Sequence, residues 1–200
     1  MQSFPLKLQY KGERNYIRGS DIYNAAMDIV QTMLDDQAWI NHIVFRGFAR
    51  NSCDLILEAP KDYSKKAIRA VCTIKHKEKL IPAIIVETNN KINERYGFDE
   101  NIVLNEVVLQ KKSIFQNRRA GFSAIEEIIV LTKHLHNKLI PIQQGRWIFS
   151  QLDLIEPFTI NNEYCYSIEL KQNLANRMTV SNIIEGDRHI GQIRFTVSSI

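Results

Sequence analysis

The sequence lacks the long hydrophobic run and the leader segment that membrane and exported proteins carry. No apolar stretch in its 200 residues reaches the roughly 20 residues that are needed to span a bilayer. The chain start, Met1 to Leu8, has no basic segment followed by an apolar one. We therefore expect a cytoplasmic protein that does not associate with a membrane.

Cysteine is scarce, and its spacing excludes the usual metal and redox motifs. The three cysteines, Cys53, Cys72 and Cys165, are odd in number and far apart in the sequence. Disulfide frameworks and Cys-based metal sites need paired or closely spaced cysteines, so neither fits this pattern. The sequence therefore predicts buried free thiols, no metal site and no cofactor held by the chain itself.

The sequence also lacks a strong excess of charge of either sign. Lys and Arg number 26 against 22 Asp and Glu, which gives a formal net charge of +4. That excess is too small for the basic surface of a nucleic-acid-binding protein, so we expect no nucleic-acid partner. The densest basic region is Lys111-Lys112 followed by Arg118-Arg119. It is either a solvated loop or a segment that receives a phosphate or an acidic carrier protein.

What the sequence does have is clear hydrophobic periodicity. Hydrophobic residues make up 44% of the chain, enough for one large core or two small ones. In the first half, residues 5–11 alternate as a strand does, and an apolar helix is predicted from Ile22 to about Asp35, with Asp21 as a suitable N-cap. Further strands are predicted at 43–48, 53–57, 68–74 and 80–87.

The same order of elements returns in the second half of the chain. A strand is predicted at 102–110, a polar loop at 111–121 and a helix at 122–139. Four strand patterns follow, at 147–158, 164–170, 178–184 and 190–197. We therefore predict two domains, residues 1–90 and 101–200, joined by a linker at 91–100.

The predicted helix at 122–139 is strongly apolar on one face and begins with two adjacent acids. Glu126 and Glu127 fall near its first turn, where the helix dipole favours anions. They are either surface acids matched to the dipole, or one of them is a positioned carboxylate at the edge of a pocket. The apolar face consists of Ile125, Ile128, Ile129, Thr132 and Leu135.

This repeated order of elements resembles the hotdog fold, in which a curved antiparallel sheet wraps a long hydrophobic helix. Two such units in one chain resemble a double hotdog, and the resemblance covers nearly all of the sequence. It implies an α+β fold of two hotdog repeats. Wrapping would explain why the helices are too apolar for a surface and why each strand needs one buried face.

Two short stretches carry a finer resemblance. Gly121-Phe-Ser-Ala-Ile-Glu126 is similar to the helix start of beta-hydroxyacyl carrier-protein dehydratases, which assigns the role of the catalytic glutamate to Glu126. The histidine that this family carries before the glycine is absent, since the region reads Gln110-Lys-Lys-Ser113. Gly19-Ser-Asp-Ile-Tyr-Asn-Ala-Ala loosely resembles the Gly-His-Val-Asn-Asn-Ala stretch of hotdog thioesterases.

The chemistry that this resemblance implies centres on the two helix starts. Backbone N–H groups there lack intrahelical partners, so they can polarise a thioester carbonyl. A carboxylate nearby can act as a general base toward water or as a general acid toward a hydroxyl. Glu126 is the first catalytic candidate, followed by Asp21 and His42. The candidates for substrate binding flank the helix starts and are Gly121, Phe122, Tyr23, Asn24, Arg18 and Arg119.

The remaining histidines do not predict a metal site. His134 and His136 lie two positions apart on the predicted helix, so they point to different faces and cannot share an ion. We expect both at the surface. His76 and His189 fall at or beside predicted hairpin tips and are likewise expected at the surface.

Two classes of function follow from the sequence. The first is an enzyme, dehydratase-like or thioesterase-like, that acts on an acyl thioester in fatty-acid or polyketide-type metabolism. The second is a non-catalytic acyl-binding or accessory hotdog subunit, which the missing histidine favours. The expected partner is an acyl carrier protein or a coenzyme A thioester, so that phosphopantetheine or coenzyme A enters with the substrate. A homodimer is compatible with either class.

Overall fold

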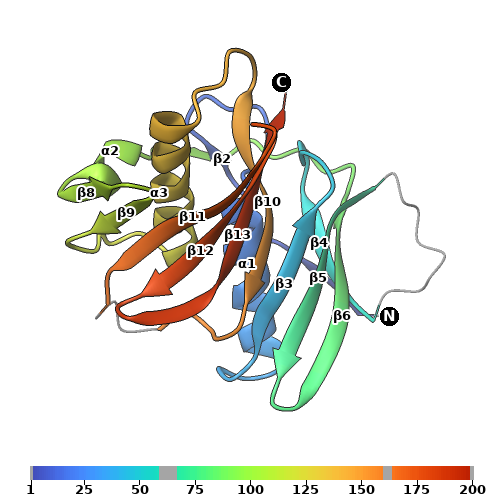
Figure 1. Cartoon of the computed structure of the whole chain (residues 1–200). Helices are drawn as coiled ribbons and strands as arrows, with labels where there is room; N and C mark the ends of the chain where they lie inside the picture. Colours follow the sequence, from blue (N-terminus) through green and yellow to red (C-terminus); the bar gives the residue numbers. More distant parts are fainter. Residues whose placement is uncertain (1, 59–66, 160–163, 199–200) are drawn as a thin grey trace. The chain divides into compact units, whose positions relative to one another are not determined.

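The computed structural model describes residues 2–58, 67–159 and 164–198 (Figure 1). These residues form two compact units, Met1–Phe98 and Asp99–Ile200. Each unit combines one principal helix with an antiparallel sheet. The chain is therefore α+β, as predicted.

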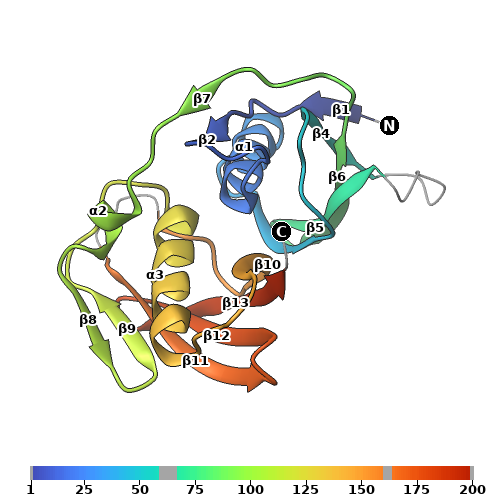
Figure 2. The ribbon, with the colours of Figure 1, turned by 90° about the horizontal axis from the view of Figure 1, so that it is seen from above.

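The first unit is a five-stranded antiparallel sheet with one helix. Its strands follow the order β1-β4-β6-β5-β3, and they curve round the helix when seen from above (Figure 2). A separate parallel pair joins β2 to β7. The elements are β1 (Gln2–Pro5), β2 (Tyr10–Lys11), α1 (Gly19–Met33), β3 (Trp39–Phe45), β4 (Cys53–Leu57), β5 (Ile68–His76), β6 (Lys79–Glu87) and β7 (Arg95–Tyr96).

The second unit has a six-stranded antiparallel sheet. Its strands follow the order β10-β13-β12-β11-β9-β8, and its main helix, α3, contacts β9, β10 and β11. The elements are α2 (Glu100–Leu104), β8 (Val107–Gln110), β9 (Ser113–Gln116), α3 (Ala124–Leu139), β10 (Arg146–Leu154), β11 (Tyr166–Leu174), β12 (Met178–Glu185) and β13 (Arg188–Ser198).

The two sheets differ in how their last hairpin is inserted. In the second unit, the first arm of the hairpin, β12, pairs with β11, and the second arm, β13, pairs with β10. In the first unit the arms are exchanged, because β5 pairs with β3 and β6 pairs with β4. Both arrangements are antiparallel and bury one face of each arm. The order of elements therefore recurs along the chain, whereas the order of strands in the sheet does not.

The main helices and most strands lie where periodicity predicts them. The 15-residue α1 begins and ends earlier than the predicted range, and the 16-residue α3 begins two residues later than predicted. The predicted strand at 102–110 is wrong in its first half. Asp99 caps a helical turn there by accepting a hydrogen bond from the backbone N–H of Asn101, so α2 forms before β8.

Three other segments also differ from the sequence-based expectation. Residues 5–11 hold only the end of β1 and the short β2, and the predicted loop at 111–121 contains β9. The segment predicted as a linker, 91–100, includes β7, and Arg95 Nη1 donates hydrogen bonds to the carbonyls of Gly12 and Arg14. This part of the chain is therefore held against the N-terminal segment.

The cysteines are free thiols, as expected. Cys53 and Cys72 lie in the core of the first unit, where burial raises the pKa of each thiol to about 12. Cys165 is only half-buried. The two core cysteines are therefore protonated at neutral pH and act as small apolar side chains.

The surface expectation was wrong for His136, which is buried, and both His76 and His134 are half-buried. His136 is completely buried, because it lies four residues after Thr132 and so continues the buried face of α3. Its ring packs 5.0 Å from that of Trp147 and 5.3 Å from that of Phe195. His76 is half-buried, and its Nε2 lies 3.0 Å from Asp35 Oδ2. Burial lowers the pKa of His136 to about 4 from its ordinary value of 6.5.

The depressed pKa of His136 predicts a loss of stability in mild acid. The unfolded chain protonates this histidine near pH 6.5, whereas the folded chain does so only near pH 4. Stability is therefore complete above pH 6.5 and falls as the pH decreases toward 4, by up to about 3 kcal/mol. The free energy of unfolding, measured by urea denaturation across this pH range, should fall less steeply for His136→Phe than for the wild type. His189→Gln, at an exposed hairpin position, is the control. Parallel profiles for His136→Phe and the wild type would contradict the assignment.

Candidate functional site

The start of α3 is closed by a capping box. Ser123 is the N-cap, and its side chain accepts a hydrogen bond from the backbone N–H of Glu126. In return, Glu126 Oε2 accepts hydrogen bonds from the backbone N–H of Ser123 at 3.2 Å and from its Oγ at 2.8 Å. This reciprocal arrangement satisfies donors that the helix itself cannot. Glu126 therefore has a structural role at the position where the sequence predicts a catalytic acid.

Removing the cap should weaken the fold modestly. Ser123→Ala deletes the side chain that caps α3 and should lower the free energy of unfolding by about 1 kcal/mol. Glu126→Gln retains an acceptor oxygen for the reciprocal bond and should change it by less than about 0.5 kcal/mol. Urea denaturation of the two variants measures both effects. A larger loss in Glu126→Gln than in Ser123→Ala would show that the carboxylate charge, and not the box, stabilises the helix start.

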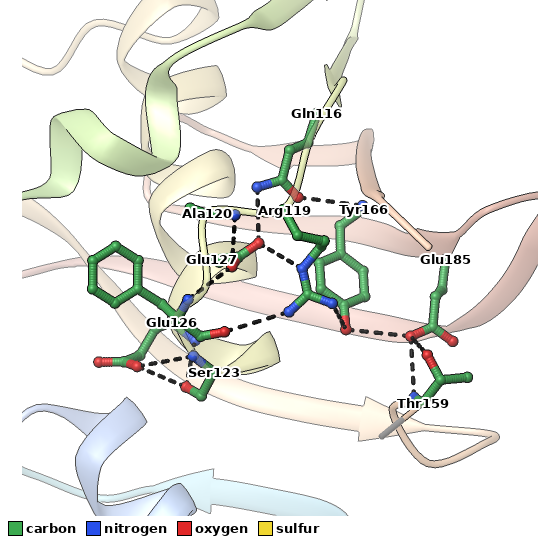
Figure 3. A network of polar contacts seen from close by, with 10 residues as sticks. Gln116, Arg119, Ala120, Ser123, Glu126, Glu127, Thr159, Tyr166 and Glu185 are labelled. Atoms are coloured by element: carbon green, nitrogen blue, oxygen red, sulfur yellow. Dashed lines mark hydrogen bonds and ion pairs between the residues drawn. The ribbon is translucent and has the colours of Figure 1, made fainter. Parts of the chain in front are cut away.

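The neighbouring acid, Glu127, is fully buried and has four hydrogen-bond donors (Figure 3). Its Oε2 accepts from Arg119 Nε and from Gln116 Nε2, each at 2.8 Å. Its Oε1 accepts from the backbone N–H groups of Ala120 and Phe122, each at 3.1 Å. The carboxylate therefore fixes the segment between β9 and α3 against the helix.

Arg119 connects Glu127, through Tyr166, to a second buried carboxylate, that of Glu185. Its guanidinium lies 4.4 Å from the centre of the Tyr166 ring, and its Nη1 is 3.3 Å from the Tyr166 hydroxyl. That hydroxyl donates to Glu185 Oε1 at 3.2 Å (Figure 3). Glu185 is fully buried and also accepts hydrogen bonds from Thr159 and Arg188. Burial, and to a lesser degree the Glu185 carboxylate, raises the pKa of Tyr166.

The polar groups at the start of α3 therefore satisfy one another. Arg119 was a candidate for substrate binding, yet its Nε, Nη1 and Nη2 have partners in Glu127, Tyr166 and the carbonyl of Phe122. Gly121, another candidate, is exposed and has a φ of +82°, which favours glycine in the turn before the helix. Phe122 is half-buried.

The start of α1 is built differently. Its N-cap is Arg18, which makes no side-chain capping hydrogen bond. The Arg18 carbonyl accepts from the backbone N–H groups of Asp21 and Ile22, each at 3.1 Å. Asp21 therefore lies within the first turn of the helix. The expectation that Asp21 is the N-cap was wrong. The helix begins earlier than predicted because the chain turns at Arg18, which is itself buried.

Asp21 is the centre of a buried cluster. Its Oδ1 lies 2.9 Å from Tyr96 Oη, 3.2 Å from Ser20 Oγ and 3.5 Å from Lys11 Nζ. The side chain of Lys11 is only 1% exposed and that of Asp21 only 9%. The Lys11 ammonium lies 3.7 Å from the centre of the Phe98 ring, a cation–π contact. The three groups on Oδ1 fix the orientation of the carboxylate, and Phe98 packs against one of them, the Lys11 ammonium.

The second carboxylate oxygen of Asp21 distinguishes this cluster from the network at α3. Asp21 Oδ2 is buried and has no hydrogen-bond partner among the described residues. Buried polar atoms in native proteins are nearly always hydrogen-bonded, so an unpaired carboxylate oxygen indicates a place for a polar molecule. It lies at a helix N-terminus, where the dipole favours negative charge. Asp21 Oδ2 can therefore accept a hydrogen bond from a bound water.

The other predicted residues are distributed around the first unit. Tyr23 is buried and Asn24 half-buried, both in α1. Arg18 joins Asp21 through the backbone, and its guanidinium carbon is 5.4 Å from the Phe98 ring centre. His42 is half-buried in β3, where the register shifts between Ile40 and His42.

Three residues in the cluster around Asp21 were not among the candidates that the sequence suggested. These are Lys11, Tyr96 and Phe98, and two of them lie in the segment predicted as a linker. The burial of a lysine cannot be predicted from hydrophobic periodicity. The parallel pairing of β2 with β7, which brings Tyr96 to Lys11, joins strands more than eighty residues apart. Within the residues that the structure describes, no group of His, Cys, Asp and Glu could hold a metal ion.

The sequence matches no protein-family model and no curated protein. Among solved structures, the chain is similar to a pyran synthase domain from module nine of the sorangicin pathway, with 5% identity and a TM-score of 0.51. The match covers 92% of this chain and 87% of that domain. The chain has the hotdog fold. This confirms the fold that the order of elements in the sequence predicts.

Two further solved structures match the hotdog chain over almost its whole length, with lower scores. One is a 12:0-ACP thioesterase from Umbellularia californica, at 7% identity, 98% and 96% coverage of the two chains and a TM-score of 0.49. The other is a monomeric dehydratase domain from a trans AT polyketide synthase split module, at 9% identity, 98% and 97% coverage and a TM-score of 0.45. No helix among the described residues is long and apolar enough to cross a membrane.

Proposed function

We propose that this hotdog protein hydrolyses an acyl thioester carried by an acyl carrier protein or coenzyme A, with Asp21 as the general base. The observation that carries the proposal is the buried, unpaired Oδ2 of Asp21 at the start of α1. Three donors on Oδ1 hold the carboxylate in place, so Oδ2 is the oxygen that can accept a proton from a bound water.

The proposed reaction needs one base and one anion-stabilising element. Oδ2 of Asp21 takes a proton as the water oxygen attacks the thioester carbonyl carbon, and negative charge develops on the carbonyl oxygen. The N-terminus of α1 stabilises that charge, because its first backbone N–H groups and dipole favour an anion. The carbon–sulfur bond then breaks, the proton passes from Asp21 to the leaving sulfur, and a carboxylic acid and a thiol are released.

Glu126 is the weaker candidate for this role. Its Oε2 is engaged by the backbone and hydroxyl of Ser123 in the capping box. The adjacent Glu127 has two donors on each carboxylate oxygen. Glu127 therefore has donors on both oxygens, and Glu126 already has a structural role in the capping box. We assign the chemistry to the first unit for this reason.

Dehydratase-like chemistry is the second candidate, because proton donors also surround Asp21. Removal of water from a 3-hydroxyacyl thioester requires a base for the proton next to the carbonyl and an acid for the departing hydroxyl. Asp21 would serve as the base, and Tyr96 Oη or Lys11 Nζ, at 2.9 Å and 3.5 Å from its Oδ1, as the acid. The third alternative is an accessory subunit that binds acyl groups without turnover.

We further propose that the chain is a double hotdog located in the cytoplasm. The two compact units and their shared order of elements support two repeats, although the last hairpin is inserted differently in each. The exposed basic residues Lys111, Lys112 and Arg118 would meet the acidic surface of a carrier protein. Arg119 is not part of this surface, because its side chain is buried. Neither a resident cofactor nor a metal is needed, and a homodimer is compatible with the proposal.

Mass spectrometry of reaction mixtures tests the proposal. Purified protein is incubated with saturated acyl-coenzyme A, acyl-pantetheine and 3-hydroxyacyl-pantetheine of several chain lengths. Hydrolysis releases a free acid and a thiol, whereas dehydration converts the hydroxyacyl substrate into an enoyl thioester with loss of water. Thiol release that Asp21→Asn abolishes supports hydrolysis. Enoyl product assigns dehydration, and binding without either product assigns an accessory subunit.

A further inference from the structure

The core of the second unit contains polar side chains that the proposed hydrolysis does not use. His136 on α3, Trp147 on β10, and Thr179 and Ser181 on β12 are all buried. The His136 and Trp147 rings are 5.0 Å apart, and His136 Nε2 is 3.4 Å from Ser181 Oγ. Thr179 lies two residues before Ser181, so it faces the same side of the sheet, and it pairs across with Phe195. These four side chains form what we call the polar cluster.

Three atoms of the polar cluster have no hydrogen-bond partner among the described residues. They are His136 Nδ1, Trp147 Nε1 and Thr179 Oγ1, all buried. Unpaired buried polar atoms are rare and costly in native proteins, so these three indicate a place that a polar molecule can occupy. The indole N–H of Trp147 can only donate, and the Thr179 hydroxyl can also donate. The occupant must therefore present an acceptor oxygen.

The surroundings of the polar cluster select an uncharged occupant. Burial lowers the pKa of His136 to about 4, so its ring is neutral at pH 7. A buried anion would find no opposite charge on the cluster residues, and an unpaired buried charge is strongly disfavoured. The neighbouring walls are aromatic, since the Phe195 ring lies 5.3 Å from His136 and 6.1 Å from Phe149. An apolar body with one oxygen fits such walls.

We propose that the polar cluster binds an uncharged molecule that carries a hydroxyl or carbonyl oxygen on an apolar body. The oxygen accepts hydrogen bonds from Trp147 Nε1 and Thr179 Oγ1, and a hydroxyl can also pair with the neutral ring of His136. The molecule is either a free aliphatic alcohol or ketone, or the oxygenated end of an acyl chain. This site is independent of Asp21, so it exists whether or not the chain hydrolyses thioesters.

Nuclear magnetic resonance of the indole N–H groups tests the site directly. The chain has two tryptophans, and Trp147→Phe identifies the signal of each. Titration of the full chain with 2-heptanone or 1-hexanol should move the Trp147 signal in a saturable way and leave the Trp39 signal in place. Hexanoate, which has a similar body and a charge, should not. Thr179→Val removes one hydroxyl at nearly constant shape and should weaken ketone binding about fivefold, the usual effect of one neutral hydrogen bond.

The controls separate the possible occupants. If Thr179→Val does not fold, Thr179→Ala removes the same hydroxyl and provides the second test. A Trp147 shift with ω-hydroxyoctanoyl-pantetheine but not with octanoyl-pantetheine assigns the oxygen to an acyl chain, and a shift with the free ketone alone assigns a free molecule. No saturable shift, an equal shift with hexanoate, or unchanged affinity in both hydroxyl variants would overturn the proposal. A long-lived water at Trp147 Nε1 that no probe displaces would also overturn it.

Discussion

Asp21→Asn should lower kcat/KM for thioester hydrolysis by a factor on the order of 100 to 10,000, the range for loss of a general base. The amide keeps the size of the side chain and can still accept hydrogen bonds from Tyr96 and Ser20 through its oxygen. It cannot take a proton from water at neutral pH. A spectrophotometric assay of thiol release measures the effect, and circular dichroism confirms that the variant is folded.

A second variant separates the loss of activity from a loss of stability. Asp21→Asn leaves the buried ammonium of Lys11 without its carboxylate partner, which is expected to destabilise the first unit. The double variant Lys11→Met with Asp21→Asn removes both charges and should recover stability without recovering activity. Glu126→Gln is the matched control in the other unit. Hydrolysis that survives in Asp21→Asn and disappears in Glu126→Gln would place the base at α3.

Glu127→Gln should lower the free energy of unfolding by about 3–5 kcal/mol, because it leaves the guanidinium of Arg119 buried without an opposite charge. The Glu127 side chain is fully buried and that of Arg119 is 7% exposed, with 2.8 Å between Oε2 and Nε. Urea denaturation measures the loss. Exchanging both residues, as Arg119→Met with Glu127→Leu, should restore part of the stability, since an uncharged pair needs no desolvation of charge.

An exposed ion pair provides the comparison for this effect. Arg188 and Glu156 are 2.7 Å apart, with side chains that are 43% and 47% exposed. Glu156→Gln should therefore cost less than about 1 kcal/mol. Similar losses for Glu127→Gln and Glu156→Gln would contradict the assignment of Glu127 as the anchor of the segment before α3.

Local patterns in the sequence predict most of the elements but not their pairing. The hairpin of β5 and β6 follows from two runs of branched apolar residues on either side of a polar tip. The end of α3 before Pro141 follows from the effect of proline. The exchanged arms of that hairpin cannot be predicted from the sequence, because each arm has the apolar residues that either position in the sheet needs. Strand order depends on contacts between distant residues, and hydrophobic periodicity does not specify which neighbour a strand selects.

The candidate site could be predicted only in part. The Ser123-x-x-Glu126 spacing is a capping-box signature, so the sequence itself contained a structural role for Glu126. His136 also carried a signal, because it continues the apolar spacing of α3. The burial of Lys11 had no such signal. It depends on Phe98 and Tyr96, which approach only through the pairing of β2 with β7.

The central claim is that the reacting carbonyl of a thioester is bound at Asp21. The most direct test is a crystal structure of the full chain with a non-hydrolysable acyl-pantetheine analogue in which a methylene replaces the sulfur. We expect the carbonyl at the start of α1, with Asp21 Oδ2 within hydrogen-bond reach of it through one water. A carbonyl bound at the start of α3 beside Glu126, or an analogue that binds at neither helix start, would contradict the account.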